Sequence, residues 1–286
     1  MHIPVLKDEV LHFLNPNNNE NFIDCTAGLG GHSYAILKKI KPDGKLLALE
    51  WDNELCEILS KKKNKRFIVV NDSYTRLKET VERLNFSSVK GVLFDLGFSS
   101  FHVDKSKRGF SFMRDEELDM RYNKNNLLTA KDIVNNEREK NLIYILEKYS
   151  DEDYAKKIAE KIIERRKEKR IETTKELANI IESAVPSSYK REKIHFATRT
   201  FQAIRIAVNG ELLGLPFALK QALDVLEKEG RMVVICFHGG EEKIVTRFFR
   251  NNRVKIITPK AITPSKEEVK KNIRSRSAKL YAIIKK

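Results

Sequence analysis

The chain has 286 residues, of which 41% are hydrophobic, and a net charge of +15. Its length fits one large domain or a core domain with an insertion, and no apolar run approaches the roughly 20 residues that a membrane span needs. The N-terminus does not have the pattern of a secretory signal, and Cys25, Cys56 and Cys236 form no Cys-x-x-Cys pair. We therefore expect a cytoplasmic protein without a disulfide framework, a metal site or a membrane partner.

The positive charge is concentrated in two segments. From Lys243 to Lys286 there are 14 basic and 2 acidic residues, and residues 156–170 contain 8 basic and 3 acidic ones. Such asymmetry favours a polyanionic partner, above all a nucleic acid. The alternative is a lysine-rich surface that only contacts solvent.

A glycine-rich motif follows the first predicted strand. Phe22 and Ile23 form a short apolar strand, residues 24–32 read Asp-Cys-Thr-Ala-Gly-Leu-Gly-Gly-His, and a helix is expected from about Tyr34. Such a turn lets the backbone approach a nucleotide-like ligand at a helix N-terminus. The spacing is not Gly-x-Gly-x-x-Gly, and Asp24 suits a ligand with a cationic or hydroxyl-rich part. The motif therefore favours S-adenosylmethionine over NAD.

Strands and helices alternate after this motif. Apolar strands are expected at 45–50, 66–70, 89–95, 232–237, 254–257 and 278–284, with helices at 53–63, 75–85, 219–226 and 241–250. Near-continuous apolar strands separated by helices indicate a parallel sheet with both faces covered. Seven strands with a late hairpin-like pair predict an α/β fold, the mostly parallel, Rossmann-like sheet of class I methyltransferases.

The alternation stops in the middle of the chain. Apolar residues recur at helical spacing over 141–149 and 155–163, and Thr173 with Glu176 predicts a capping box before a third helix. We therefore predict an all-helical insertion at 103–197 that faces RNA, and a core formed by 1–102 and 198–286.

Three side chains are expected beside the glycine-rich motif, because ligands of such sheets lie at the carboxyl ends of the strands. Glu50 ends the second strand, 20 residues after Gly30, where a carboxylate accepts ribose hydroxyls. Tyr74 follows the third strand and would pack on adenine, and Asp95 ends the fourth. Without a ligand, Glu50 would be an exposed strand-end carboxylate and Tyr74 a buried loop aromatic.

Asp95 has two possible roles. A carboxylate that accepts the hydrogens of an exocyclic base amine helps to localise the nitrogen lone pair for methyl transfer, without a metal. Alternatively, Asp95 is only a cofactor ligand. The sequence leaves both open.

Several strings together resemble one family along nearly the whole chain, the bacterial ribosomal small-subunit RNA (cytosine-N4)-methyltransferases. The most specific are Arg-Gly-Phe-Ser-Phe at 108–112, Leu-Asp-Met-Arg at 118–121 and Thr-Phe-Gln-Ala at 200–203. The match also covers residues 2–6, 24–33, 95–100, 197–209 and 272–278. The resemblance implies S-adenosylmethionine-dependent N4-methylation of a decoding-region cytidine in 16S rRNA, within the 30S subunit.

The resemblance also implies a set of cofactor contacts. The set is Gly30, Gly31, His32, Glu50, Tyr74, Asp95 and His102. Three of these depart from the usual residues of the family, since Glu50, Tyr74 and His102 stand where Asp, Phe and Gln are common. Outside this set, Gly239-Gly240 replaces a usual Ser-Leu.

Candidate RNA contacts lie in three places. One helix face at 199–209 suits either phosphate and base-edge contacts or a buried network that braces the insertion. Arg108 and Phe110 would clamp and stack an extruded base, with aromatic core packing as the alternative. The basic residues near the C-terminus would contact phosphates or form a solvated strand face. The helix and C-terminal candidates are Arg199, Gln202, Arg205, Asn209, Arg274 and Arg276.

Two rival functions stay open. A DNA amino-methyltransferase usually carries Asp/Asn/Ser-Pro-Pro-Tyr/Phe/Trp where this chain has Asp95-Leu96-Gly97-Phe98. A non-catalytic rRNA-binding or assembly factor that retains the fold would not bind S-adenosylmethionine. The oligomeric state, a homodimer included, is also open.

Overall fold

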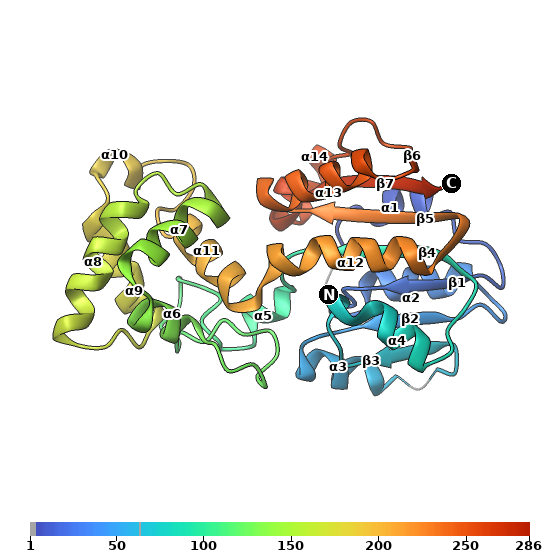
Figure 1. Ribbon diagram of the computed structural model, residues 1–286, viewed down its shortest axis with the longest axis horizontal. Helices are drawn as coiled ribbons and strands as arrows, with labels where there is room; N and C mark the ends of the chain where they lie inside the picture. Colours follow the sequence, from blue (N-terminus) through green and yellow to red (C-terminus); the bar gives the residue numbers. More distant parts are fainter. Residues whose placement is uncertain (1–3, 63) are drawn as a thin grey trace. The chain divides into compact units, whose positions relative to one another are not determined.

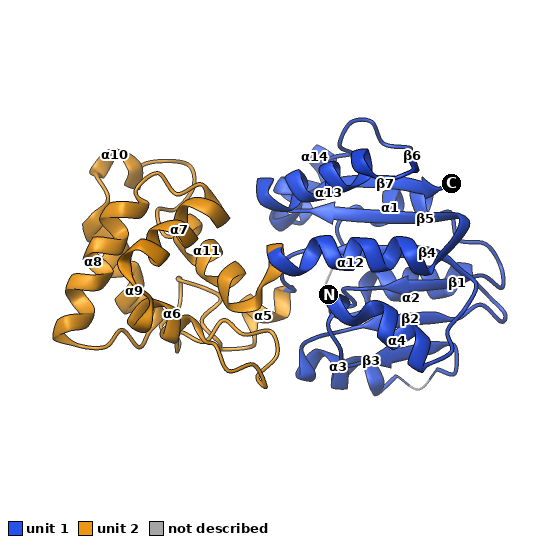
Figure 2. Ribbon diagram, in the orientation of Figure 1, with its two compact units in different colours: residues 1–99, 213–286 blue, residues 100–212 orange. Residues whose placement is uncertain are grey.

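The computed structural model describes residues 4–62 and 64–286, which form two compact units. Unit 1 comprises Met1–Ser99 with Leu213–Lys286, and unit 2 comprises Ser100–Leu212 (Figure 2). The predicted insertion at 103–197 lies inside unit 2. Residues 198–212, which we assigned to the core, also belong to unit 2, because α11 (Thr198–Asn209) packs against helices α6 (Ala130–Asn136) and α7 (Glu139–Ser150).

Unit 1 is built on a seven-stranded sheet with the order β3-β2-β1-β4-β5-β7-β6 (Figure 1). The first five strands are parallel, and β7 is antiparallel to both of its neighbours. This is the class I methyltransferase arrangement, so the predicted fold is confirmed. The strands are β1 (Asn21–Asp24), β2 (Leu46–Leu49), β3 (Phe67–Val70), β4 (Val89–Asp95), β5 (Leu226–Cys236), β6 (Val254–Ile256) and β7 (Lys279–Lys285).

Helices cover both faces of this sheet, since successive side chains of a strand point to opposite sides. Leu47 and Leu49 belong to one hydrophobic cluster, with residues of α4 (Leu77–Arg83), α12 (Glu211–Val225) and α13 (Gly239–Asn251). Leu46 and Ala48 belong to the other, with residues of α1 (Lys7–Leu14), α2 (Gly31–Lys39) and α3 (Asn53–Ser60). Burial on both faces explains why these strands are apolar at every position.

The boundary between α12 and β5 differs from the prediction. Leu226 and Gly230, expected at the end of a helix, lie in β5, because Leu226 pairs with Val89 of β4. Helix α1, helix α14 (Lys266–Lys271) and the short helices η1 (Tyr74–Arg76) and η2 (Ile273–Ser277) were not assigned from the sequence. Among the described residues, no helix is long and apolar enough to cross a bilayer.

Unit 2 is helical, as predicted for the insertion. The Thr173 side chain accepts the backbone N–H of Glu176, and the Glu176 carboxylate accepts the backbone N–H of Thr173, which confirms the capping box. A second box, Thr129 with Asp132, starts α6. The remaining helices of the unit are α5 (Ser100–Asp104), α8 (Ala155–Glu168), α9 (Thr174–Ala184) and α10 (Ser187–Lys190).

Candidate functional site

Acidic residues gather at the carboxyl edge of the parallel strands. Asp24 is the last residue of β1, Glu50 follows β2 and Asp95 is the last residue of β4. Because β2, β1 and β4 are neighbours in the sheet, these three carboxylates belong to one edge. That edge is where open α/β sheets bind their ligands.

The loop between β1 and α2 is held from the inside by Asp24, which is 1% exposed. One carboxylate oxygen accepts the Ser33 hydroxyl at 2.6 Å, and the other accepts the backbone N–H of Thr26 at 3.1 Å. Burial is the main reason why the pKa of Asp24 is raised. Asp24 therefore braces the loop and contributes a carboxylate beneath it.

Two glycines of this loop occupy conformations that other residues rarely adopt. Gly28 and Gly30 have φ angles of +54° and +83°. A Cβ on Gly30 would also lie 2.5 Å from a ring carbon of Tyr34. The tight turn thus requires glycine, and it ends at the N-terminus of the nine-residue helix α2, whose first backbone amides have no partner within the helix.

Glu50 links the loops that follow β1 and β2. Its two oxygens accept the backbone N–H groups of Gly28 at 2.7 Å and Asp52 at 2.8 Å. Burial outweighs these two hydrogen bonds and raises the pKa of Glu50 to about 8. Each oxygen of an ionised carboxylate retains a further lone pair. Two additional donors, such as the hydroxyls of a ribose, would satisfy this buried group.

His32 and Asp95 form a second polar pair at this edge. The imidazole Nε2 lies 3.5 Å from a carboxylate oxygen of Asp95, and the backbone N–H of Asp95 donates to the Thr26 hydroxyl at 2.6 Å. Burial lowers the pKa of His32, but the nearby carboxylate of Asp95, followed by the charge of Asp24, raises it on balance. His32 Nδ1 and Asp95 Oδ1 have no hydrogen-bond partner among the described residues.

These features fit S-adenosylmethionine. Buried polar atoms without partners mark a place where a ligand supplies them, the carboxylates suit a cation and a diol, and the glycine turn lets the backbone approach the ligand. Tyr74 is half-buried beside β4, with its ring centroid 6.0 Å from that of Phe94. Among residues 4–62 and 64–286, no group of three His, Cys, Asp or Glu side chains is placed to hold a metal.

Known proteins match the chain along its full length. The model of the MraW methylase family matches residues 1–286. The chain belongs to this family. Proteins named "Ribosomal RNA small subunit methyltransferase H" are similar to it: those from Dictyoglomus thermophilum and a Sulfurihydrogenibium species are each 44% identical over 98% of this chain and 95% and 97% of their own lengths. A Caldicellulosiruptor saccharolyticus protein of the same name is 43% identical over 98% and 97%.

Membership of the MraW methylase family confirms the resemblance stated from the motifs. Among solved structures, a Streptococcus mutans protein described as a putative methyltransferase in complex with SAH is 13% identical, with a TM-score of 0.48 over 100% of both chains. The fold assignment rests on the strand order of the sheet rather than on this overlap.

In unit 2, part of the predicted RNA-binding face of this MraW-family chain forms a buried network. Arg205 donates from Nε and Nη2 to the two oxygens of Glu211, both at 2.9 Å. Asn209 donates to the Met120 carbonyl at 2.8 Å and accepts the backbone N–H of Tyr122 at 2.9 Å. Arg205 and Asn209 are each 7% exposed, so the structure favours the bracing role that the sequence left open.

Arg108, Phe110 and His102 are also buried in unit 2. Arg108 donates from Nη1 to the carbonyls of Arg121 and Tyr122 at 3.0 and 2.9 Å. The Phe110 ring stacks on Tyr122 with centroids 5.6 Å apart, and the His102 ring lies 4.9 Å from Phe110. Of the predicted cofactor contacts, His102 belongs to unit 2 and the other six to unit 1.

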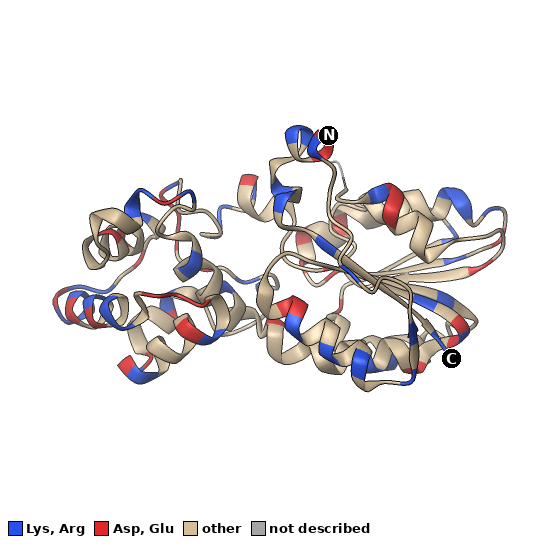
Figure 3. Ribbon diagram, turned by 90° about the horizontal axis from the view of Figure 1, so that it is seen from above, with Lys and Arg blue, Asp and Glu red and all other residues tan. Residues whose placement is uncertain are grey.

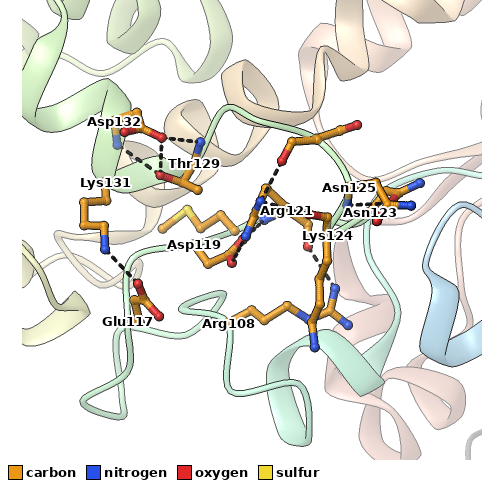
Figure 4. A network of polar contacts seen from close by, with 12 residues as sticks. Arg108, Glu117, Asp119, Arg121, Asn123, Lys124, Asn125, Thr129, Lys131 and Asp132 are labelled. Atoms are coloured by element: carbon orange, nitrogen blue, oxygen red, sulfur yellow. Dashed lines mark hydrogen bonds and ion pairs between the residues drawn. The ribbon is translucent and has the colours of Figure 1, made fainter.

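The Leu-Asp-Met-Arg string shapes the loop that Arg108 holds (Figure 4). Arg121 donates from Nε and Nη2 to the two oxygens of Asp119, each at 2.8 Å. Its Nη1 donates to the carbonyls of Lys124 and Asn126 at 3.0 and 2.6 Å. This motif therefore orders residues 119–126 of the chain itself.

The remaining candidates are more accessible. Arg199 donates to the Tyr189 hydroxyl at 2.9 Å and Gln202 is half-buried, whereas Arg274 and Arg276 are exposed. Figure 3 shows basic and acidic residues interleaved on the helices of both units. In α8, Lys161 and Arg165 pair with Glu164 and Glu168 at 2.6 and 2.8 Å, which compensates part of that basic segment.

Sequence reasoning did not single out Thr26 and Ser33, which hold Asp95 and Asp24 in place. Both residues lie inside or directly after the glycine-rich motif, and that proximity was the available signal. Glu211 was also missed. No local pattern distinguishes it from a solvated glutamate, because its partner Arg205 becomes buried only when unit 2 folds.

Proposed function

We propose that this chain transfers a methyl group from S-adenosylmethionine to N4 of a cytidine in the decoding region of 16S rRNA. The observation that carries the proposal is the set of buried polar groups at the carboxyl edge of the sheet, in a member of the MraW methylase family. Relatives named small-subunit rRNA methyltransferases support the substrate class. We place the reaction in the cytoplasm, on the assembling or assembled 30S subunit.

When bound, S-adenosylmethionine supplies an electrophilic methyl group on a sulfonium. The glycine turn at 28–31 and the first amides of α2 receive its polar end, and Glu50 accepts both ribose hydroxyls. Tyr74 lies beside the adenine, and Gly30, Gly31 and His32 shape the turn. His102, which belongs to unit 2, stays a predicted cofactor contact on the resemblance alone.

Asp95 is proposed to act on the acceptor amine. Its Oδ1, which has no partner among the described residues, accepts a hydrogen of the cytosine amino group, while His32 and Thr26 hold the residue in place. This contact directs the nitrogen lone pair toward the methyl carbon, and the amine proton then passes to solvent. The protein contributes mainly in-line positioning.

For the RNA, we propose that Arg274 and Arg276 contact phosphates, together with Arg199 and Gln202 where these are accessible. Arg108, Phe110, Arg205 and Asn209 act indirectly, by holding the shape of unit 2. Figure 4 shows how Arg108 and Arg121 fix one loop of that unit.

The decisive experiment supplies methyl-labelled S-adenosylmethionine together with 30S subunits or free 16S rRNA, both lacking base methylation. We expect label in N4-methylcytidine after nuclease digestion of the RNA. Label on 30S alone would identify the assembled particle as the substrate, and label in neither would contradict the proposed function. Sedimentation of the free enzyme would distinguish a monomer from a homodimer.

A further inference from the structure

The start of the chain lies against the glycine turn. A Cβ on Gly31 would be 3.0 Å from the Cβ of Pro4, so the proline ring touches the backbone at the first residue of α2. Leu6, two residues further on, is 0% exposed and packs in the hydrophobic cluster that also contains Ile36 of α2. Residues 4–6 therefore support one side of the turn.

The backbone of Leu6 is held in a conformation that leucine avoids. Its φ and ψ angles of 52° and 37° are left-handed, a conformation that brings the Cβ of an L-residue too close to the following carbonyl oxygen. Such strain persists only where the surroundings enforce it. Here the Leu6 N–H donates to a carboxylate oxygen of Glu268 at 2.8 Å, a bond strengthened by the charge of the acceptor.

Glu268 belongs to α14, which has only six residues. A helix this short is not stable alone, so its order depends on contacts with the rest of the fold. One such contact is the bond of the Glu268 carboxylate to the Leu6 N–H, while the Ser265 hydroxyl caps the helix locally by accepting the backbone N–H of Glu268 at 3.1 Å. Burial lowers the pKa of His32, but Asp95, Asp24 and then Glu268 raise it, so the charge of Glu268 also acts on the cofactor edge.

Several exposed basic residues follow Glu268. They include Arg274 and Arg276, the proposed phosphate contacts, and the described side chains of Lys270 and Lys271 are exposed as well. One short segment thus presents positive charge to solvent and a carboxylate to the N-terminal residues. We call residues 266–276 the basic segment.

We propose that Glu268 is a positioning residue that ties residues 4–6 to the glycine turn and couples the basic segment to the S-adenosylmethionine site. The inference rests on the proposed function. A polyanion bound to the basic segment stabilises α14 in its folded conformation. A cofactor bound at the glycine turn stabilises residues 4–6 in their position against that turn. Because Glu268 joins the two, each ligand strengthens the binding of the other by the same factor.

The first test measures the binding of S-adenosylhomocysteine by calorimetry to the full chain and three variants. Glu268→Ala should weaken binding about tenfold, as expected for loss of a hydrogen bond to a charged group. Glu268→Gln keeps an acceptor oxygen for Leu6 and should restore most of the affinity. Glu267→Ala, which removes the same charge from the neighbouring exposed position, is the matched control and should bind as the wild type does.

A second readout does not depend on the ligand. Hydrogen exchange at the Leu6 amide should accelerate in Glu268→Ala and not in Glu267→Ala, because only the first variant removes the acceptor of that N–H. If Glu268→Ala does not fold, Pro4→Ala tests instead the contact of residues 4–6 with Gly31 and should also weaken S-adenosylhomocysteine binding. Equal affinities and equal exchange in Glu268→Ala and Glu267→Ala would overturn the inference.

The coupling is tested by equilibrium dialysis of labelled S-adenosylhomocysteine with and without unmethylated 30S subunits. In the wild type, 30S should tighten binding by about fivefold, at the lower end of ordinary coupling between sites. This ratio should fall to about one in Glu268→Ala, and an unchanged ratio would overturn the coupling. A wild-type chain that binds no S-adenosylhomocysteine would instead contradict the proposed function.

Discussion

The two units use buried polar residues in opposite ways. At the sheet edge of unit 1, His32 Nδ1 and Asp95 Oδ1 are buried and lack a partner among the described residues. In unit 2, Arg205, Asn209 and Glu211 are buried as well, but they bind one another and nearby backbone groups at 2.8–2.9 Å. The first arrangement leaves hydrogen-bonding capacity unused, whereas the second is satisfied within the folded unit. Buried polar residues that were predicted as site residues therefore differ: those of unit 1 can still bind a ligand, and those of unit 2 stabilise the fold.

The largest effect expected from this contrast is that of Asp95→Ala. Removing an acceptor that acts in the transition state costs on the order of 10²–10³ in turnover, as for donors that stabilise an oxyanion. Methyl transfer to unmethylated 30S subunits measures it. Asp43→Ala, in an exposed turn of the same unit, is the control and should retain full activity.

The same variant separates the two roles of Asp95. If S-adenosylmethionine binds Asp95→Ala with nearly unchanged affinity while turnover is lost, the carboxylate acts on the acceptor. A matching loss of affinity would make it a cofactor ligand only. Turnover close to that of the wild type would exclude both roles.

Substitutions in the unit 2 network should lower the stability of the protein and leave cofactor binding unchanged. Glu211→Ala leaves the Arg205 guanidinium buried without its carboxylate, which we expect to destabilise unit 2 by about 3–5 kcal/mol. Urea unfolding followed by circular dichroism measures the loss, and S-adenosylmethionine binding to the folded fraction should be unchanged.

A compensating variant checks that the unpaired charge is the cause. Arg205→Met combined with Glu211→Leu removes both charges and should recover much of the lost stability, because apolar replacements of similar volume are tolerated. If the double variant is as unstable as Glu211→Ala, the unpaired charge of Arg205 is not the cause of the lost stability.

The same contrast explains which features could be predicted from the sequence. All seven strands contain apolar runs, and the Thr173–Glu176 box is a local pattern, so both were recognised. The role of Arg205 was not, because a helical face of Arg, Gln and Asn looks the same whether it meets RNA or another helix. Leu226 was misassigned because pairing with Val89 of β4 overrides its helical spacing.

Glu50 should make cofactor binding depend on pH. Its pKa of about 8 in the free protein means that the carboxyl is mostly protonated at neutral pH. Ribose hydroxyls donate to the ionised form, so binding lowers the pKa and releases a proton. The affinity for S-adenosylmethionine should therefore fall by up to about tenfold per unit as the pH decreases below 8. Calorimetry between pH 6 and 9 measures this, and a flat profile would contradict it.

Glu50→Gln is the matched variant. It should bind more weakly at pH 9 and lose the pH dependence. It should also stabilise the free protein at high pH. Since the folded-state pKa lies above the ordinary 4.5, the unfolded state releases its proton first, and native stability falls as the pH rises from 4.5 through 8. Thermal unfolding at pH 6 and pH 9 compares the two proteins.

The smallest effect concerns the basic residues outside both networks. Arg274→Ala and Arg276→Ala should each weaken RNA binding modestly and reduce the slope of log affinity against log salt by about 0.7–0.9, the value for one phosphate contact. Lys161→Ala is the control, because its ammonium lies 2.6 Å from the Glu164 carboxylate and contributes less to the field outside the protein. Filter binding between 50 and 200 mM salt, a range that resolves such slopes, measures all three variants. An unchanged slope in both arginine variants would mean that the RNA lies elsewhere, and the basic segment would then lose its role in the coupling through Glu268.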